Sequence, residues 1–383
     1  MHGKRVGIYV DARRLKCKTC GKTFMETLPE VNARRWMTER LVRWIGERSL
    51  KQTFTGIAEE IGVTEGTVRN VFSDYVNDLQ RTIRFETPKW MGIDEIHIIK
   101  RPRVVISNLH DNTAVELLPN RYKTTVATYL SGLEGKGDIR YVAIDMWEPY
   151  KDAVLPQAIV VVDKFHVQRM GNQAIDEFRR SLNRRETGDV LRKKAAGAKK
   201  DAYLFRKRER DLTVQERFFL EGWIKNIPEL GEAWQLKEAY YAIYDAPTRE
   251  EAARRYQSWA SEVTPEFQPA FGDILTAWRN WQPYILNYFD HRITNAFTES
   301  LNSLIRVMNR MGRGYSFEAL RAKILFSRGA HKTALRKPAF KRQSRFEAMV
   351  GYATMHRMAA EPETVNYGVD VGKLAALIES GGI

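Results

Sequence analysis

Three acidic residues stand where a carboxylate could do chemistry. Asp94 interrupts an apolar run, Asp145 ends a second apolar run, and Glu299 lies in a predicted helix much later in the chain. A lone buried carboxylate is costly unless it is paired or bound to a cation. Because no Cys or His cluster accompanies them, these acids describe an oxygen-rich site suited to Mg²⁺ or Mn²⁺. Two such ions can activate a water or a 3′-hydroxyl for in-line attack on a phosphodiester.

The helical spacing around Glu299 separates an apolar face from a polar stripe, at about 100° per residue. The apolar face holds Phe297, Leu301, Leu304, Ile305 and Met308. The polar stripe holds Asn295, Glu299, Asn302, Ser303, Arg306 and Arg310. This stripe is either a surface that faces solvent, or a catalytic carboxylate beside arginines that grip phosphates.

Apolar runs predict the sheet that would position the two aspartates. Strands are expected over residues 90–99, 104–109, 114–118, 141–145 and 158–162, with a helix over 123–133. Apolar strands flanked by helices indicate a buried sheet with parallel members. The order β-β-β-α-β-α-β matches an RNase H-like core, a mixed sheet flanked by helices, in a chain of the α+β class. Either aspartate alone could cap a following helix, but two on neighbouring strands favour a shared site.

Residues 165 to about 290 are predicted to be almost wholly helical, and they carry most of the aromatic side chains. Most of these aromatics are expected in a core, although one or two could stack on DNA bases. The predicted domains are residues 1–30, 31–85, 86–175 (first part of the core), 176–290 (helical insertion), 291–350 (second part of the core) and 351–383 (tail).

Residues 31 to about 80 have the pattern of a helix-turn-helix. A first helix carries Trp36 and Met37, and two further helices, 54–61 and 64–72, flank a turn at Gly62. Arg69, Asn70 and Ser73 would face outward, where a recognition helix meets the major groove. A three-helix unit that does not bind DNA is the plainer interpretation.

Cys17 and Cys20 are the only two cysteines, and they form a CxxC pair. A tetrahedral zinc site needs four thiolate or imidazole ligands, of which such a pair supplies two. No second pair is present, and His2 is the only close histidine. Residues 1–30 are therefore either a partial zinc-ribbon-like β unit or a turn with two free thiols. Two cysteines in a large chain also indicate a reducing compartment.

The chain is basic, with 62 Lys and Arg against 47 Asp and Glu. Residues 179–210 carry a net charge of +9 and residues 306–345 a net charge of +11, so the excess is concentrated. Focused positive charge suits phosphate backbones, although each block could be a solvated helix surface. The candidate DNA contacts in these blocks are Arg192, Lys193, Lys194, Arg306 and Arg310. With no apolar run near the roughly 20 residues of a membrane span and no apolar leader, a soluble intracellular protein is expected.

Four short blocks carry a resemblance to a known family. They are Gly92–Glu95, Ile144–Tyr150, Val162–Val167 and Thr298–Asn302. In this order they resemble bacterial insertion-sequence DDE transposases of the ISL-three family (ISL3), and the likeness runs from Arg14 to the C-terminus. The resemblance implies a zinc ribbon, a helix-turn-helix, and an RNase H-like domain with a helical insertion before the catalytic glutamate. The family normally has a second CxxC upstream of Cys17, and here that half of the zinc ligand set is absent.

The resemblance also implies an activity. Such an enzyme binds the terminal inverted repeats of its element, hydrolyses phosphodiester bonds there, and joins the exposed 3′-hydroxyls to target DNA. Asp94, Asp145 and Glu299 would hold two Mg²⁺ ions, with Mn²⁺ as a substitute. The implied partners are double-stranded DNA and further copies of the chain, in a homodimer or larger synaptic complex. The implied location is the bacterial cytoplasm, at the nucleoid when the protein is bound to DNA.

Two readings of the second aspartate stay open. Asp145 is favoured over Asp163 because it follows the fourth strand, where this fold carries its second metal ligand. Asp163 and His166 then resemble the (C/D)xxH element of Mutator-like transposases, a supporting motif. The plainer interpretations are a helix N-cap for Asp163 and a packed or phosphate-contacting side chain for His166.

Two rival functions also stay open. The chain could be an inactive or domesticated derivative that acts only as a DNA-binding regulator, which the missing CxxC favours mildly. It could also be an RNase H-like nuclease that cuts without joining, against which the helix-turn-helix and the long insertion argue.

Overall fold

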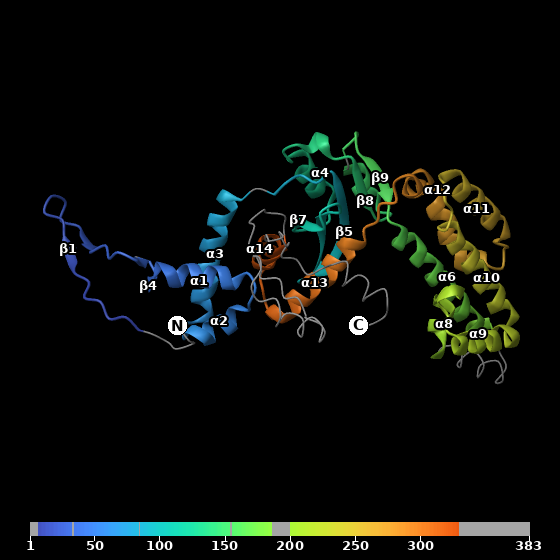
Figure 1. Ribbon diagram of the computed structural model, residues 1–383, viewed down its shortest axis with the longest axis horizontal. Coiled ribbons are helices and arrows are strands. Elements are labelled where there is room, and N and C mark those ends of the chain that lie inside the picture. The colour runs from blue at the N-terminus through green and yellow to red at the C-terminus, as the bar shows by residue number, and fades with distance from the viewer. Residues whose placement is uncertain (1–6, 33, 84, 154, 186–199, 329–383) are drawn as a thin grey trace, which may run out of the picture. The chain divides into compact units, whose positions relative to one another are not determined.

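The computed structural model describes residues 7–32, 34–83, 85–153, 155–185 and 200–328 (Figure 1). The chain divides into two structural units: Met1–Glu86 together with Ala322–Ile383, and Thr87–Arg321. Arg192, Lys193, Lys194 and the predicted tail 351–383 lie outside the described residues. Within the described ranges, no helix combines the length and the apolar character that crossing a membrane requires.

The first unit begins with two short antiparallel hairpins. β1 (Arg14–Lys16) pairs with β2 (Thr23–Met25), and β3 (Val31–Asn32) pairs with β4 (Met37–Thr38). Three helices follow: α1 (Glu39–Ser49), α2 (Phe54–Ile61) and α3 (Glu65–Thr82). The prediction that Trp36 and Met37 belong to the first helix is wrong. Trp36 has a φ of 50° and Met37 lies in β4, so the helix begins after Thr38, whose side chain caps it.

The turn between α2 and α3 follows from its sequence. Gly62 ends α2 with a φ of 78°, a left-handed conformation that costs glycine little. The side chain of Thr64 then caps α3 by accepting a hydrogen bond from the Thr67 N–H at 3.2 Å. Ile57, Val68 and Val71 are buried in the small core. The predicted turn, cap and core of the helix-turn-helix are confirmed, and α3 extends further than predicted.

The second unit is built on a five-stranded sheet in the order β7-β6-β5-β8-β9. Its strands are β5 (Trp90–Ile98), β6 (Arg101–Asn108), β7 (Thr113–Leu118), β8 (Tyr141–Ile144) and β9 (Ile159–Val162). β5, β6 and β7 pair antiparallel, whereas β5, β8 and β9 pair parallel. The connections contain α4 (Lys123–Ser131), a 3₁₀ turn at Lys136–Asp138 and α5 (Glu148–Ala153). This mixed α/β arrangement has the predicted order of elements.

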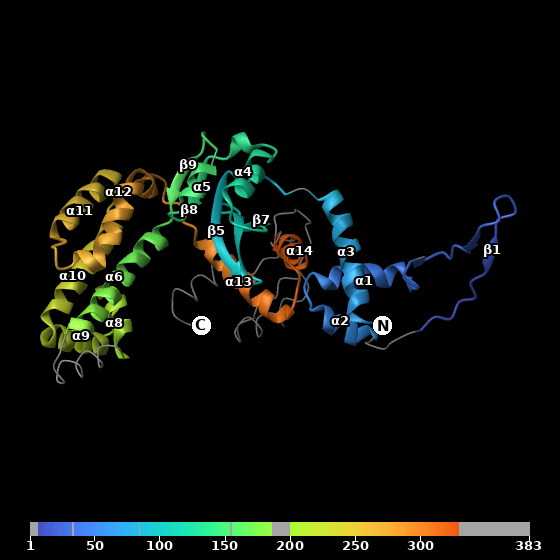
Figure 2. The same ribbon diagram turned by 180° about the vertical axis from the view of Figure 1, so that it is seen from behind.

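The two faces of β5 have different neighbours because successive side chains of a strand point to opposite faces. Met91 and Ile93 belong to the apolar cluster that also contains Val126 and Leu130 of α4. Gly92 and Asp94 therefore point to the other face. α13 (Ala296–Gly312) packs there along β5 and β6 (Figure 2), and α14 (Phe317–Arg328) ends the described chain.

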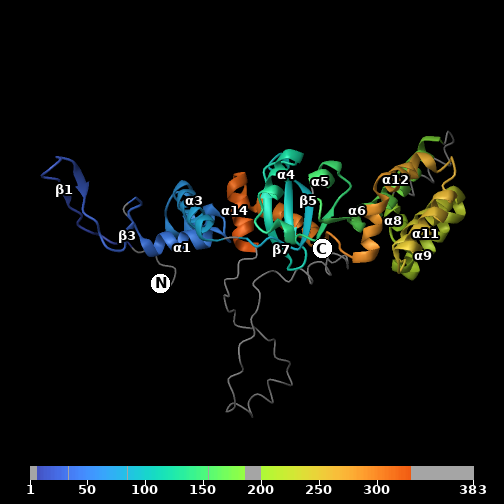
Figure 3. The same cartoon turned by 90° about the horizontal axis from the view of Figure 1, so that it is seen from above.

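Helices fill most of the described residues between β9 and α13, as predicted. They are α6 (Lys164–Arg185), α8 (Ala202–Arg206), α9 (Val214–Asn226), α10 (Pro228–Ile243), α11 (Arg249–Glu262) and α12 (Gln268–His291), with a 3₁₀ turn at Glu209–Asp211. α6 and α12 pack against each other, and α12 also packs against β9, so these two long helices join the bundle to the sheet (Figure 3).

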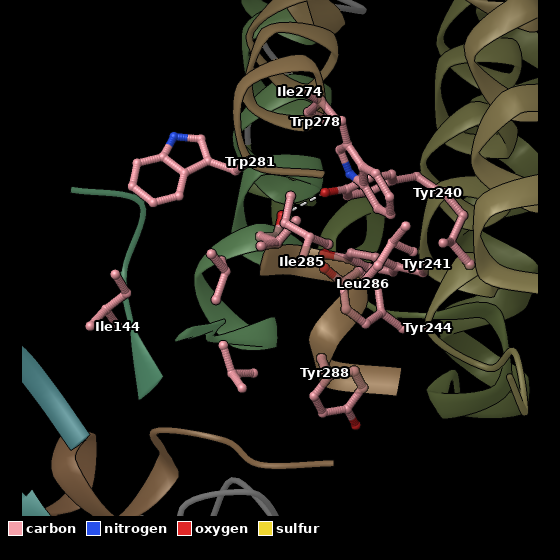
Figure 4. Close-up of a cluster of buried hydrophobic side chains, with 14 of the residues drawn as sticks. Ile144, Tyr240, Tyr241, Tyr244, Ile274, Trp278, Trp281, Ile285, Leu286 and Tyr288 are labelled. Carbon is pink, nitrogen blue, oxygen red and sulfur yellow. Dashed lines mark hydrogen bonds between the residues drawn. The ribbon is translucent and has the colours of Figure 1, made fainter. Parts of the chain in front are cut away.

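Aromatic side chains form the core of this bundle, as most of them were predicted to do. Figure 4 shows Tyr240, Tyr241 and Tyr244 gathered opposite Trp278. The rings of Tyr256 and Trp278 stack with their centroids 4.1 Å apart. The Tyr240 hydroxyl donates to the Val167 carbonyl oxygen at 2.9 Å, and Trp259 Nε1 donates to the Leu236 carbonyl oxygen at 2.8 Å. We refer to Tyr240, Tyr241, Tyr256, Trp259, Phe271 and Trp278 as the aromatic core.

Candidate functional site

The register of the parallel strands brings three aspartates to one edge of the sheet. Gly92 pairs with Ala143, and Ile144 pairs with Val162. Continuing this register by one or two residues places Asp94 level with Asp145, and Asp145 level with Asp163. Because the carboxyl ends of parallel strands meet at one edge, side chains from β5, β8 and β9 can share one site.

Two overlapping groups of possible metal ligands result. The ligand atoms of Asp94, Asp145 and His166 lie within 4.8 Å of one another, and so do those of Asp163, His166 and Glu299. His166 belongs to both groups. Asp94 and Asp145 thus share one group, and Glu299 joins Asp163 in the other, with His166 common to both.

Asp94 is buried in the middle of β5, with 6% of its surface exposed. Its Oδ2 accepts a hydrogen bond from Asn302 Nδ2 at 2.8 Å, and its Oδ1 accepts one from the Glu95 N–H at 2.7 Å. Burial raises the pKa of Asp94, and the charge of Asp163 adds to this, while His166 and Arg306 oppose it. A positive charge placed at this edge would relieve the cost of keeping Asp94 ionised.

Asp145 follows β8 directly and has a buried oxygen to spare. Burial raises its pKa to about 6, with the nearby charges of Asp94 and Glu95 contributing, while His166 opposes the shift. Among the described residues, Asp145 Oδ1 has no hydrogen-bond partner. A buried carboxylate oxygen without a partner is a poor arrangement for stability and a suitable one for a cation ligand.

Asp163 is engaged differently, although it lies level with Asp145. It is completely buried, and its Oδ1 accepts a hydrogen bond from the backbone N–H of Asn295 at 2.9 Å. Its Oδ2 lies 3.3 Å from Nδ1 of His166. Both oxygens therefore already have protein partners, one on the segment that leads into α13 and one on α6.

His166 and Glu299 complete the site from the two helices. Burial works against protonation of His166, but its hydrogen bond to Asp163 and the charges of Asp163, Asp94 and Asp145 outweigh burial and raise its pKa. Glu299 is partly buried in the first turn of α13. Burial raises the pKa of Glu299, and the charges of Asp163 and Asp94 act in the same direction.

The residues Ser107, Asn295, Thr298 and Asn302 form what we call the polar seam between α13 and the sheet. All four are buried. Thr298 Oγ1 donates to Asn295 Oδ1 and lies 2.6 Å from Ser107 Oγ, while Asn295 Nδ2 donates to the Ile93 carbonyl oxygen at 3.2 Å. The seam ties the helix that carries Glu299 to the strand that carries Asp94.

Gly92 makes the seam possible. A Cβ at this position would lie 2.3 Å from Asn295 Oδ1, 2.4 Å from Thr298 Oγ1 and 2.7 Å from Ser107 Oγ. These separations are too short for any side chain, so only glycine lets α13 approach β5 closely. Glycine within a strand, two residues before an aspartate, was the signal in the sequence that could have predicted this contact.

Sequence reasoning placed Asn295 and Asn302 on a polar stripe with Glu299, and that placement is wrong in part. Asn295 and Asn302 are buried in the polar seam, whereas Ser303, Arg306 and Arg310 are exposed. The helical wheel separates apolar from polar positions, but it does not reveal that the facing strand offers polar partners. The buried face of α13 is therefore polar near Glu299 and apolar only at Leu301 and Ile305.

The donor set fits a divalent cation. Three carboxylates of raised pKa lie close together, so a cation would offset both their burial and their mutual repulsion. Carboxylate oxygens are the ligands that Mg²⁺ prefers, and Asp145 Oδ1 is free to serve as one. The residues that could hold such an ion fall into two groups: Asp94, Asp145 and His166, and Asp163, His166 and Glu299.

The proposed DNA contacts of α3 lie on its outer side. Asn70 and Ser73 are exposed, and Arg69 is half-buried. Arg69 Nε donates to Glu65 Oε1 at 2.9 Å, so the guanidinium is held against the preceding turn of α3. The backbone oxygen of Asn70 accepts a hydrogen bond from Arg35 at 3.0 Å, and the side chain of Asn70 is exposed.

Cys17 and Cys20 lie in the turn of the β1–β2 hairpin as free thiols. The backbone N–H groups of Cys20 and Thr19 lower the pKa of Cys17, because they stabilise the thiolate. Within the described part of the chain no third ligand joins the two cysteines. Only half of a tetrahedral zinc site is therefore visible, and His2 lies outside the described residues.

Two family profiles match the chain. The profile of the DDE domain of ISL3, described as a transposase, matches residues 91–324. The profile described as the helix-turn-helix domain of transposase family ISL3 matches residues 26–76. The first match includes the whole candidate metal site, and the second includes α1, α2 and most of α3.

Curated relatives match most of the chain. The transposase for insertion sequence element IS1557 of Mycobacterium tuberculosis, in strains CDC 1551 / Oshkosh and ATCC 25618 / H37Rv, is 26% identical over 363 residues, which cover 86% of this chain and 80% of that protein. The transposase for insertion sequence element IS1001 of Bordetella parapertussis is 22% identical over 319 residues, which cover 81% of this chain and 78% of that protein.

Proposed function

Because the chain belongs to the ISL3 family of transposases, we propose that it moves an insertion sequence by cutting and joining DNA at the terminal inverted repeats. In this proposal it hydrolyses one phosphodiester bond at each end and then joins the exposed 3′-hydroxyls to target DNA. The observation that carries the proposal is the pair of ligand groups that share His166, Asp94 with Asp145 and Asp163 with Glu299, together with the Asp145 oxygen that has no partner among the described residues.

Asp94, Asp145 and Glu299 would hold the divalent ions. When bound, two such ions polarise the attacking hydroxyl and stabilise the leaving oxygen of an in-line displacement. The protein's own residues hold these metal ligands in position. Asn302 orients the carboxylate of Asp94 through its hydrogen bond, and the polar seam holds Glu299 at its distance from β5.

Asp163 and His166 have a supporting role in this proposal. Asp163 accepts hydrogen bonds from Asn295 and His166, so it links the segment that leads into α13 to α6. His166, with its raised pKa, would carry a positive charge among the carboxylates at lower pH. We therefore assign the second metal-ligating aspartate to Asp145.

The catalytic core would be RNase H-like. Support comes from three antiparallel strands followed by two parallel strands, with acids at the centre of β5, at the end of β8 and on a later helix. We also keep the six predicted domains as a proposal, with a helical insertion of residues 176–290 between the two parts of the core.

Arg69, Asn70 and Ser73 would help to read the inverted repeats, since they lie on the outer side of a capped second helix. Exposed Arg306 and Arg310, on the helix of Glu299, would contact phosphates near the reacting bond. Because two ends must be cut together, a dimer or larger synaptic complex would be the active form.

Strand transfer with a precut inverted-repeat end in Mg²⁺ tests the proposal. Wild type should join the labelled 3′ end to plasmid DNA, and Asp145→Ala should abolish joining. Asp163→Ala should leave measurable joining, because its loss disturbs alignment without removing a metal ligand. Abolition by Asp163→Ala alone would reverse the assignment of the second aspartate.

The rival functions give different results in the same assay. A nuclease would cut a full-length end but would never join a precut one. A DNA-binding regulator would retain binding to the inverted repeat in every variant and would neither cut nor join.

A further inference from the structure

A recess opens beside Glu299, where α6 faces Arg208 and α10. Its volume is about 360 Å³, at the lower end of the range for sites that hold one small ligand. One wall consists of Phe165, Gln168, Arg169 and Asn172 of α6. Tyr241 of α10 and Arg208 form the opposite wall, and Glu299 lies at the edge. The recess thus borders the candidate metal site through a residue that belongs to both.

The sequence builds the α6 wall by simple helical spacing. Phe165, Gln168, Arg169 and Asn172 follow the i, i+3, i+4, i+7 pattern that places side chains on one face of a helix. Gly171 brings α10 close to this helix. A Cβ there would lie 3.0 Å from a ring carbon of Tyr240 and 3.1 Å from one of Tyr241, so a larger residue would push α10 outward.

The charges in the recess are few. Arg208 is already held by Asp245, to which it donates two hydrogen bonds of 3.0 and 2.6 Å. Arg169 is exposed and makes no hydrogen bond or ion pair within the described ranges. One guanidinium is therefore available to a ligand, opposite the carboxylate of Glu299. This arrangement can accept a single phosphate, whereas a polyphosphate would need more positive charge.

The rest of the lining is aromatic and amide. Phe165 and Tyr241 supply aromatic surface, with Lys164 5.1 Å from the Phe165 ring centroid and Arg208 5.8 Å from that of Tyr241. Gln168 and Asn172 offer both donors and acceptors. The Oδ1 atom of Asn172 is buried and has no partner in the part of the chain that the structure describes. Ring faces together with amide groups suit a planar ligand with polar edges, and the free guanidinium suits a phosphate attached to it.

We propose that this recess receives one unpaired nucleotide of the DNA strand, next to the phosphodiester bond that is cut. The proposal rests on the function proposed above and adds to it a ligand subsite. The base would lie against the aromatic wall with its edge toward Gln168 and Asn172, and Arg169 would contact the adjoining phosphate. Removing a base from the duplex at the reacting step would widen the access of Glu299 to the scissile phosphate.

Binding of modified inverted-repeat ends tests this inference without any cleavage. Duplexes with a single mismatch at each position around the cleavage site are compared with the paired duplex, in Ca²⁺, by fluorescence anisotropy. A mismatched base costs less to unpair, so wild type should bind one mismatched duplex about tenfold more tightly. Asn172→Ala and Gln168→Ala should lose most of that preference while keeping affinity for the paired duplex. Gln173→Ala, an exposed amide on the same helix, is the matched control and should keep the preference.

The outcomes separate this inference from the function on which it rests. Equal affinity of wild type for the paired and all mismatched ends overturns the nucleotide subsite, and so does an unchanged preference in Asn172→Ala and Gln168→Ala. Failure of wild type to join a precut end in Mg²⁺ overturns the proposed function instead.

Discussion

The polar seam and the aromatic core are both buried, but they hold their elements together in different ways. In the seam, Ser107, Asn295 and Thr298 exchange short hydrogen bonds at fixed positions. In the aromatic core, rings such as those of Trp259 and Trp278 contribute large buried areas. A single hydrogen bond contributes about 0.5–1.5 kcal/mol net, whereas deleting a buried tryptophan costs about 3–5 kcal/mol.

The difference indicates which region stabilises this unit and which region sets the positions of the candidate metal ligands. The insertion owes its stability to the area of its rings, which tolerate small shifts. The seam contributes less to the free energy of unfolding, but it fixes the distance between Glu299 and Asp94, because a hydrogen bond fails when its atoms move by a fraction of an ångström. We therefore expect mutations in the two regions to affect different measurements.

The largest effect on stability is expected from the aromatic core. Trp259 is 1% exposed and donates a hydrogen bond to the Leu236 carbonyl oxygen at 2.8 Å. Trp259→Ala should lower the free energy of unfolding by about 3–5 kcal/mol in urea denaturation. The Mg²⁺ concentration that gives half-maximal joining should stay the same in the folded fraction. A large rise in that concentration would show that the aromatic core also positions the metal ligands.

Asp145→Asn should abolish joining but raise the stability of the metal-free protein near neutral pH. The raised pKa of Asp145, about 6, means that the metal-free folded state holds a proton more tightly than the unfolded state, whose carboxyl titrates near 3.8. Stability should therefore fall as pH rises from about 4 to 6, by at most ~3 kcal/mol. Asp145→Asn should abolish joining and remove the part of this dependence that Asp145 contributes, while Asp94 and Glu299, whose pKa values are also raised, keep theirs. Denaturation between pH 4 and 8 in EDTA measures it, and an unchanged pH profile in the variant would contradict this cause.

Gly92→Ala tests the steric tightness of the seam. The added methyl would overlap Asn295, Thr298 and Ser107, so α13 must move away from β5. We expect a loss of about 1–3 kcal/mol in stability and a loss of joining of about 100-fold, since displacing catalytic groups by 1 Å costs about that much. The matched change in the insertion, Gly171→Ala, meets only ring carbons at 3.0 and 3.1 Å and should affect joining less. Equal losses of joining in Gly92→Ala and Gly171→Ala would show that the seam is no more important for joining than the insertion.

The smallest effect on stability is expected from Asn302→Ala. It deletes the amide that donates to Asp94 Oδ2, so Asp94 loses its orientation while the fold stays intact. Partners that orient metal ligands are worth about 10- to 100-fold in metal affinity or activity, and the Mg²⁺ requirement should rise by that factor. Ser303→Ala, an exposed neighbour on the same helix, is the control. A Mg²⁺ titration of joining that leaves Asn302→Ala unchanged would remove Asn302 from the site.

Much of this architecture could be predicted because short stretches of sequence determine it. Gly62 and Thr64 specify the helix-turn-helix by turn and cap chemistry, and the apolar runs that contain Asp94 and end at Asp145 specify strands. The polar seam could not be predicted, because it depends on which strand faces α13 and at what register. Asn302 is an ordinary polar position on a helical wheel until Asp94 is known to lie opposite.

The choice between Asp145 and Asp163 also depends on contacts that local sequence patterns do not reveal. Sequence order alone leaves both residues at the ends of neighbouring strands. Their partners separate them, because Asp163 has both oxygens occupied by Asn295 and His166, while Asp145 has a buried oxygen without one. Such a distinction needs the positions of residues more than 100 apart in the chain.

The most direct measurement of the central claim is an anomalous difference map from crystals of the protein grown with Mn²⁺ and a precut inverted-repeat end. The account predicts manganese peaks within coordination distance of carboxylate oxygens of Asp94, Asp145 and Glu299. Peaks bound by Asp163 in place of Asp145, or a Glu299 carboxylate that contacts no metal, would contradict it.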